Sequence, residues 1–192
     1  MTTAGGRWIP KAWRAVIILF AALSLLRPVA ISAQPQIGPR VLWSVVPDDG
    51  FCVASTNYDG DAAVHVVLNW KTDQISLFLF DPSWIRLAKP DGARVDLALK
   101  LQGNGKHNRW SSENAVINHV EDVGVSLIVA RWNKEHIANF LSSWSSTSGF
   151  SVDADGLKLR SFPLAGSKDA MSRLSQCAAD GLKRESSGVL VD

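Results

Sequence analysis

The segment 103–110 holds the side chains with the clearest capacity for chemistry in this sequence. Lys106 and Arg109 are cationic, and His107 adds positive charge when it is protonated. Trp110 follows them with a large aromatic surface. Cations of this kind bind carboxylates and phosphates, and an exposed tryptophan can anchor an interface. A solvated hairpin tip whose glycines serve only the turn is the better account of this segment. The alternative is a binding loop for an anionic sugar, a lipid head group or a partner's acidic face.

Tryptophan is frequent in this chain, and six of its eight tryptophans follow residue 33. Most of them should lie in the core, because each buries a large apolar area. Trp84 and Trp110 stand next to turn-forming residues, which favours exposure. We interpret these two as candidate interface anchors.

The histidines give no sign of a catalytic site. General acid–base catalysis needs at least two titratable groups that converge on a reacting atom, and the four histidines are scattered along the chain. The sequence has no nucleophile elbow, no His-Glu-x-x-His helix and no phosphate-binding glycine loop. We expect a protein that is not an enzyme, with an enzyme of unrecognised class as the remaining alternative.

No cofactor or metal is expected. The segments 57–61 and 153–156 have the Asp-x-Asp spacing that can supply oxygen ligands to calcium, but no glutamate follows to complete an EF-hand. Turn formation by Asp and Gly explains both segments better. Neither cysteine has another Cys or a His at ligand spacing.

The two cysteines, Cys52 and Cys177, predict a disulfide, because an even count in an exported chain favours one. Two separate buried thiols are the alternative. A helix that begins at Ser167 as its N-cap would place Ala170, Leu174 and Cys177 on one apolar face. The thiol of Cys177 would then point into the core, towards Cys52.

Residues 1–33 have the pattern of a secretory signal peptide. Three basic residues precede the apolar run 15–26, and small residues at 31–33 offer a cleavage site. A retained membrane anchor is the alternative, but a spanning helix needs about 20 apolar residues. Arg27 and Pro28 end the run before that length. We therefore expect a periplasmic or secreted protein that meets the membrane only through this segment.

The charge of the chain argues against a nucleic-acid partner. The sequence has 20 Lys and Arg residues and 18 Asp and Glu residues. Four of the basic residues and none of the acidic ones lie in the expected signal peptide, so the remaining chain is slightly acidic. No basic field remains to attract a polyanionic nucleic acid.

The rest of the chain predicts one β-rich domain over residues 34–180, followed by a polar tail at 181–192. The run 75–80 carries apolar side chains on both faces, which predicts a central strand covered on both sides. Ile137, Phe140, Leu141 and Trp144 form one apolar helical stripe. We predict an α+β fold, mainly an antiparallel, sandwich-like sheet with two packed helices and one disulfide. The expected strands are 41–46, 51–56, 64–70, 75–80, 94–101, 115–120, 125–130, 150–152 and 157–162.

The closing part of the chain resembles the invasion-associated locus B family of small exported bacterial proteins. The resemblance rests on the helix 137–144, the hairpin after it, and the corner 162–167 with Ala170, Leu174 and Cys177. A signal peptide followed by Trp43 and Cys52 is also similar. The family carries additional cysteines that this chain lacks. The resemblance implies an envelope or surface protein linked to host-cell entry, not to a catalysed reaction.

The sequence thus leaves three hypotheses about function. The first is a non-catalytic envelope or secreted protein that binds an unidentified envelope protein, host protein or glycan. The second is a periplasmic domain that binds a small molecule or polysaccharide, and the third is an enzyme of unrecognised class. A protein binder should expose an apolar patch, a ligand binder should have an aromatic pocket, and an enzyme should bring titratable groups together in one.

Overall fold

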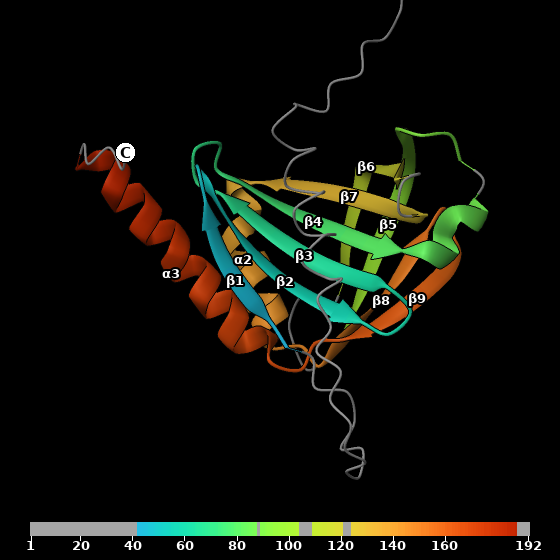
Figure 1. Cartoon of the computed structure of the whole chain (residues 1–192). Coiled ribbons are helices and arrows are strands. Elements are labelled where there is room, and N and C mark those ends of the chain that lie inside the picture. The colour runs from blue at the N-terminus through green and yellow to red at the C-terminus, as the bar shows by residue number, and fades with distance from the viewer. Residues whose placement is uncertain (1–41, 88, 104–108, 121–123, 188–192) are drawn as a thin grey trace, which may run out of the picture. The chain divides into compact units, whose positions relative to one another are not determined.

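A computed structural model describes residues 42–87, 89–103, 109–120 and 124–187, and the fold below concerns these residues. They form one antiparallel sheet of nine strands with two α-helices and a short 3-10 helix (Figure 1). The expected signal peptide lies outside the described residues. The predicted fold class, α+β with a mainly antiparallel sheet and two helices, is confirmed.

The first four strands follow one another in the sheet, as a meander. They are β1 (Ser44–Asp48), β2 (Phe51–Tyr58), β3 (Ala62–Asn69) and β4 (Gln74–Asp81). The predicted turn between β1 and β2 is present, and its two central residues are Asp49 and Gly50. Gly50 has a φ of 85°, a conformation that glycine adopts without steric strain.

The chain then crosses to the other half of the sheet through η1 (Pro82–Leu87). The strands β5 (Ala93–Gln102), β6 (Arg109–Val120) and β7 (Val125–Asn133) return towards β4, and β7 pairs with β4. The helix α2 (Lys134–Ser145) leads to the hairpin β8 (Gly149–Ala154) and β9 (Leu157–Pro163), which extends the sheet beyond β5. The helix α3 (Ser167–Ser186) closes the described chain. The resulting strand order is β1-β2-β3-β4-β7-β6-β5-β8-β9.

The strand β4 is buried on both faces, as its sequence predicted. Leu77 and Leu79 belong to the main core, whereas Ser76 and Phe78 on the opposite face are also buried. His65 of β3 lies beside Phe78 in the register, on the face opposite Val64 and Val66. Burial lowers the pKa of His65 to about 4, so this imidazole is neutral at physiological pH.

The sheet bends so that its last strand contacts its first half, which gives the sandwich-like packing from a single sheet. The ring of Tyr58 on β2 lies 5.1 Å from that of Phe162 on β9, and the Tyr58 hydroxyl donates to the carbonyl of Pro163 over 2.8 Å. Burial raises the pKa of Tyr58, so the hydroxyl keeps its proton for this bond. Arg160 on β9 reaches Asp81 at the end of β4 over 2.8 Å.

The helices differ from their predictions at two ends. Gly166 is the N-cap of α3, with φ at 82°, and Ser167 is the first helical residue. The Ser167 hydroxyl does not cap the helix but donates to the carbonyl of Trp144 over 2.9 Å, which joins α3 to α2. The helix α3 continues past residue 180 to Ser186, and Gly181 is buried against Trp70.

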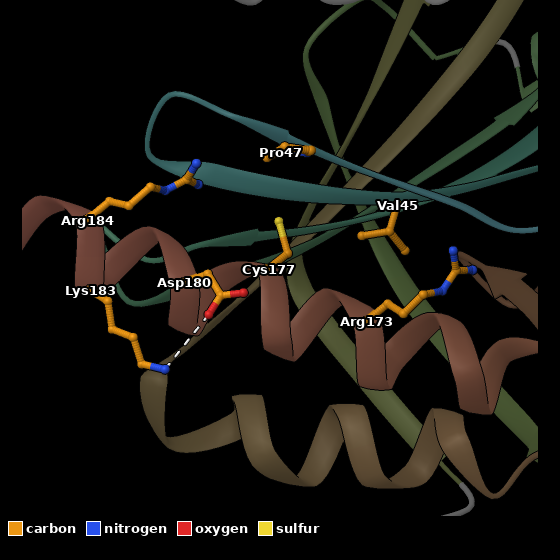
Figure 2. Close-up of a pocket in the computed structure, with 7 residues that line it drawn as sticks. All are labelled: Val45, Pro47, Arg173, Cys177, Asp180, Lys183 and Arg184. Carbon is orange, nitrogen blue, oxygen red and sulfur yellow. Dashed lines mark ion pairs between the residues drawn. The ribbon is translucent and has the colours of Figure 1, made fainter. Parts of the chain in front are cut away.

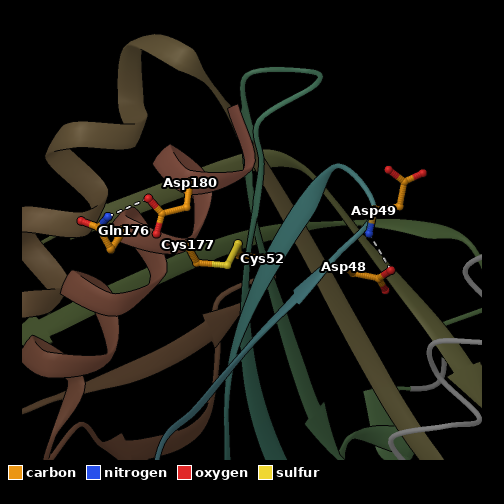
Figure 3. Close-up of a disulfide and its surroundings, with 6 residues drawn as sticks. All are labelled: Asp48, Asp49, Cys52, Gln176, Cys177 and Asp180. Carbon is orange, nitrogen blue, oxygen red and sulfur yellow. Dashed lines mark hydrogen bonds between the residues drawn. A yellow bond between two sulfur atoms is a disulfide. The ribbon is translucent and has the colours of Figure 1, made fainter. Parts of the chain in front are cut away.

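The predicted disulfide is present. Cys52 of β2 is bonded to Cys177 of α3, with 6.2 Å between their Cα atoms and a sequence separation of 125 (Figure 3). Ala170 and Leu174 lie buried on the same face of α3, as the spacing predicted. A stable disulfide indicates an oxidising, exported environment. In the described residues, no helix is both long and apolar enough to span a bilayer.

Candidate functional site

Trp84 does not lie on the surface, and its interpretation as an interface anchor was wrong. The side chain is 0% exposed, and its ring meets that of Phe162 edge-on at 6.3 Å. Trp84 lies in η1 and not in an open turn. A short 3-10 helix can direct an apolar side chain inward, so the neighbouring turn residues did not predict exposure.

Trp110 is also a core residue. It is 8% exposed, and its ring lies 5.3 Å from Phe140 and 5.8 Å from Trp132. The reason is that β6 begins at Arg109, so successive side chains alternate between the two faces of the sheet. Arg109 therefore points outward, and Trp110 points inward.

Of the predicted loop, only Arg109 remains as a surface candidate, since Lys106 and His107 lie outside the described residues. Arg109 is exposed and stands directly opposite Lys100 of β5 in the register. Two like charges in this arrangement repel each other. Lys100 forms an ion pair with Asp153 of β8 over 2.8 Å, which offsets part of that repulsion.

The predicted turn function of Asp155 agrees with its contacts. Its carboxylate binds Lys89 and accepts a hydrogen bond from the backbone amide of Asp96. These two interactions, with Lys89 the stronger, hold the pKa of Asp155 below its usual value. Among the residues that the structure places, no three Asp, Glu, His or Cys side chains gather as a metal site would require.

His119 and Ser126 form the nearest approach to a catalytic pair. Nε2 of His119 lies 2.7 Å from the carbonyl oxygen of Lys89, which can only accept, so Nε2 carries a proton. In the neutral ring, Nδ1 then accepts from the hydroxyl of Ser126 over 3.0 Å. A serine–histidine pair can supply a nucleophile, but Ser126 is 0% exposed. No substrate reaches that hydroxyl in this structure, and the pair joins β6, β7 and the segment before β5.

This structural role gives a first prediction. Replacement Ser126→Ala should lower the free energy of unfolding by about 1–2 kcal/mol, because it leaves the partly buried Nδ1 of His119 without its donor. Chemical denaturation measures the loss, and a fluorophosphonate probe should fail to label Ser126 in the native protein. Labelling at Ser126 would contradict the structural role and restore the enzyme hypothesis.

An open depression lies between β1 and α3, and we call it the β1–α3 groove. It has a volume of about 550 Å³ (Figure 2). Two β1 residues form one wall, and α3 with its half of the disulfide forms the other. Its lining residues are Val45, Pro47, Arg173, Cys177, Asp180, Lys183 and Arg184.

The charge of the β1–α3 groove is mainly positive. Arg173, Lys183 and Arg184 face one carboxylate, Asp180. That carboxylate accepts a hydrogen bond from Gln176 over 2.9 Å and lies 3.8 Å from Lys183. Within the described part of the chain, Arg184 forms no ion pair. The groove therefore offers exposed positive charge to a ligand.

At the Arg173 end of the groove, hydrogen bonds join α3 to the chain before β1. Nη2 of Arg173 donates to the carbonyl of Trp43 over 3.2 Å, and the indole of Trp43 donates to the carbonyl of Ala165 over 3.2 Å. Nε of Arg173 also lies 3.1 Å from Asp169. The disulfide ties α3 to Cys52 of β2, whose partner in the register is Pro47 of β1.

Sequence reasoning missed this groove, although part of its signal was readable. Arg173, Cys177, Asp180 and Arg184 are spaced at i, i+4, i+7 and i+11, which places them on one face of a helix. The sequence does not show that this helix face lies opposite β1, because the packing of α3 on β1 joins residues that are far apart in the chain.

Comparison with known proteins adds no assignment, since the sequence matches no protein-family model, no curated protein and no solved structure.

Proposed function

We propose that this chain is an exported, non-catalytic binding domain of the periplasm or the secreted fraction. Its β1–α3 groove binds an acidic segment of a partner protein. The observation that carries the proposal is the groove itself, an open depression with three cations and one already engaged carboxylate. Charge of this kind steers an acidic partner towards the site and selects against basic ones.

Export is supported by the signal-peptide pattern of residues 1–33 and by the disulfide. The resemblance to the invasion-associated locus B family adds the expectation of a role in the cell envelope or in host-cell entry. The partner would then be an envelope or host protein whose exposed segment carries carboxylates.

The proposal predicts a charge-dependent interaction at α3. Arg184→Glu should weaken binding of a fluorescein-labelled hexaglutamate peptide about tenfold, because it replaces an attraction by a repulsion worth about 1.4 kcal/mol. Fluorescence anisotropy at low and moderate salt measures the effect. Lys158→Glu is the matched control, since it makes the same charge change on an exposed residue of β9. Equal affinities of Arg184→Glu and the wild type would contradict the proposal.

A polysaccharide or small-molecule site is the second candidate, and one observation favours it. A smaller depression of about 430 Å³ on β5, β8 and β9 is lined by Lys100, Lys158 and Arg160 among others, close to Arg109. An anionic polysaccharide such as polygalacturonate would fit these cations. In that case Lys158→Glu would abolish binding of the polysaccharide, whereas Arg184→Glu would leave it unchanged.

A further inference from the structure

We infer that the acidic segment binds in an extended conformation and pairs with β1, as a tenth antiparallel strand of the sheet. This inference rests on the function proposed above and specifies how the partner is held. The argument starts from β1, which stands at one edge of the sheet and pairs with β2 alone among the described strands. An edge strand presents unpaired backbone groups, to which an extended peptide can add.

The sequence of β1 determines which backbone groups point to the open edge. Asp48 and Phe51 close the two-residue turn, so they form a hydrogen-bonded pair, and residues 46 and 44 follow in the same phase. Residues 43, 45 and 47 then direct their backbone groups outward. Pro47 agrees with this phase, because a proline without an N–H is tolerated only where its nitrogen faces the open edge.

Few groups remain for a partner, which sets the register. The carbonyl of Trp43 already accepts from Arg173, and Pro47 has no donor. Among the described residues, the N–H and the carbonyl of Val45 and the carbonyl of Pro47 are left for pairing. An antiparallel partner residue opposite Val45 would exchange two hydrogen bonds with it, as in a regular hydrogen-bonded pair.

The two walls of the groove have similar lengths. The four residue steps of β1 from Ser44 to Asp48 span about 13 Å at ~3.3 Å per residue. From Arg173 to Arg184 the helix axis rises about 16 Å at 1.5 Å per residue. A segment of about five extended residues along β1 would therefore reach Arg173 at one end and Arg184 at the other.

The groove also specifies a side-chain pattern for the partner. Side chains of an added strand that lie on the same face as Val45 point towards α3 (Figure 2). Arg173 and Arg184 favour carboxylates at the two ends. Val45 and the disulfide sulfur of Cys177 favour an apolar side chain in the middle, where Asp180 would repel a carboxylate. The expected motif is acidic-x-apolar-x-acidic.

The test uses the capped peptide Thr-Asp-Thr-Val-Thr-Asp-Thr and its two N-methylated forms, measured by isothermal titration with the full exported domain. Methylation of the central Val nitrogen should weaken binding about tenfold, because it removes the hydrogen bond to the carbonyl of Val45 and blocks close approach. Methylation of the following Thr nitrogen is the control, since that amide points away from β1. Its affinity should stay near that of the unmodified peptide.

A protein variant tests the same pairing from the other side. Val45→Pro removes the outward N–H of β1 and should weaken peptide binding, whereas Val45→Ala keeps that N–H and controls for the loss of the side chain. If both methylated peptides bind equally and Arg184→Glu still weakens binding, strand addition is wrong, and the binding of an acidic segment in the β1–α3 groove stands. If the unmodified peptide fails to bind, or Arg184→Glu has no effect on its affinity, both proposals are overturned.

Discussion

Replacement of both Cys52 and Cys177 by alanine is expected to lower the free energy of unfolding by about 5 kcal/mol. The bond closes a loop over a sequence separation of 125 residues. In the chain-entropy description, a loop of this size restricts the unfolded chain by an amount equivalent to about 5 kcal/mol. Urea denaturation of the oxidised wild type and the double variant measures the difference.

The disulfide is expected to act mainly by restricting the unfolded chain, and the reduced wild type serves as a control. Wild-type protein treated with a reductant should unfold at the same urea concentration as the double variant, within the small cost of replacing two thiols by alanine. A difference below about 1 kcal/mol between oxidised and reduced protein would contradict the proposed role of the bond. It would mean that α3 holds its position on the sheet without it.

Arg160→Met is expected to lower the free energy of unfolding by about 3 kcal/mol, because it leaves a buried carboxylate without its cation. The side chain of Asp81 is 2% exposed, and Oδ2 lies 2.8 Å from Nη1 of Arg160. Arg160 also donates to the carbonyl of Asp59 over 2.9 Å and lies above the ring of Phe162. Its loss should therefore loosen the contact between β9 and the ends of β2 and β4.

An ion pair on the surface with the same interatomic distance serves as a control for the effect of burial. Lys134 and Asp73 also form an ion pair at 2.8 Å, but their side chains are 75% and 51% exposed. Lys134→Met should change the free energy of unfolding by no more than about 0.5 kcal/mol, as is typical of solvated pairs. Equal effects of the two substitutions would show that Asp81 is better solvated than the structure indicates.

The Arg160–Asp81 pair also predicts a dependence on pH. Burial opposes ionisation of Asp81, but hydrogen bonds from Ser83 and Arg160 and the charge of Arg160 outweigh it and hold its pKa below the usual value. A carboxylate with a lowered folded-state pKa stabilises the fold above its unfolded pKa of about 4, and this stabilisation is lost as pH falls through the folded value. The difference between wild type and Arg160→Met should therefore narrow as the pH is lowered from 7 towards 3.

Much of the fold could be predicted from short stretches of sequence. The turn at Asp49 and Gly50 follows from a glycine at the position with a positive φ, and the burial of β4 on both faces follows from apolar residues on both sides of the strand. The position of Cys177 on the inner face of α3 follows from helical spacing. In each case the information lies within one element and needs no distant partner.

The candidate site depended on information of another kind. Trp84 and Trp110 were expected on the surface because they stand beside polar turns, but their exposure is decided by the helix η1 and by the first residue of β6. A shift of one residue in a strand moves each side chain to the opposite face. The residues of a turn do not by themselves define at which residue the next strand begins, and so do not define which of its side chains point inward.

The sequence by itself determined the class of the fold, the hairpin turns, the pairing of the two cysteines and the export pattern, because these depend on local spacing and on a count of two. Only the tertiary structure decided that β7 returns to β4, that β9 meets β2 and β4, and that α3 lies along β1. Such contacts join residues distant in the chain, and many alternative pairings would satisfy the same local patterns. The groove exists because one of them, fixed by the disulfide, places a cationic helix face beside an open strand edge.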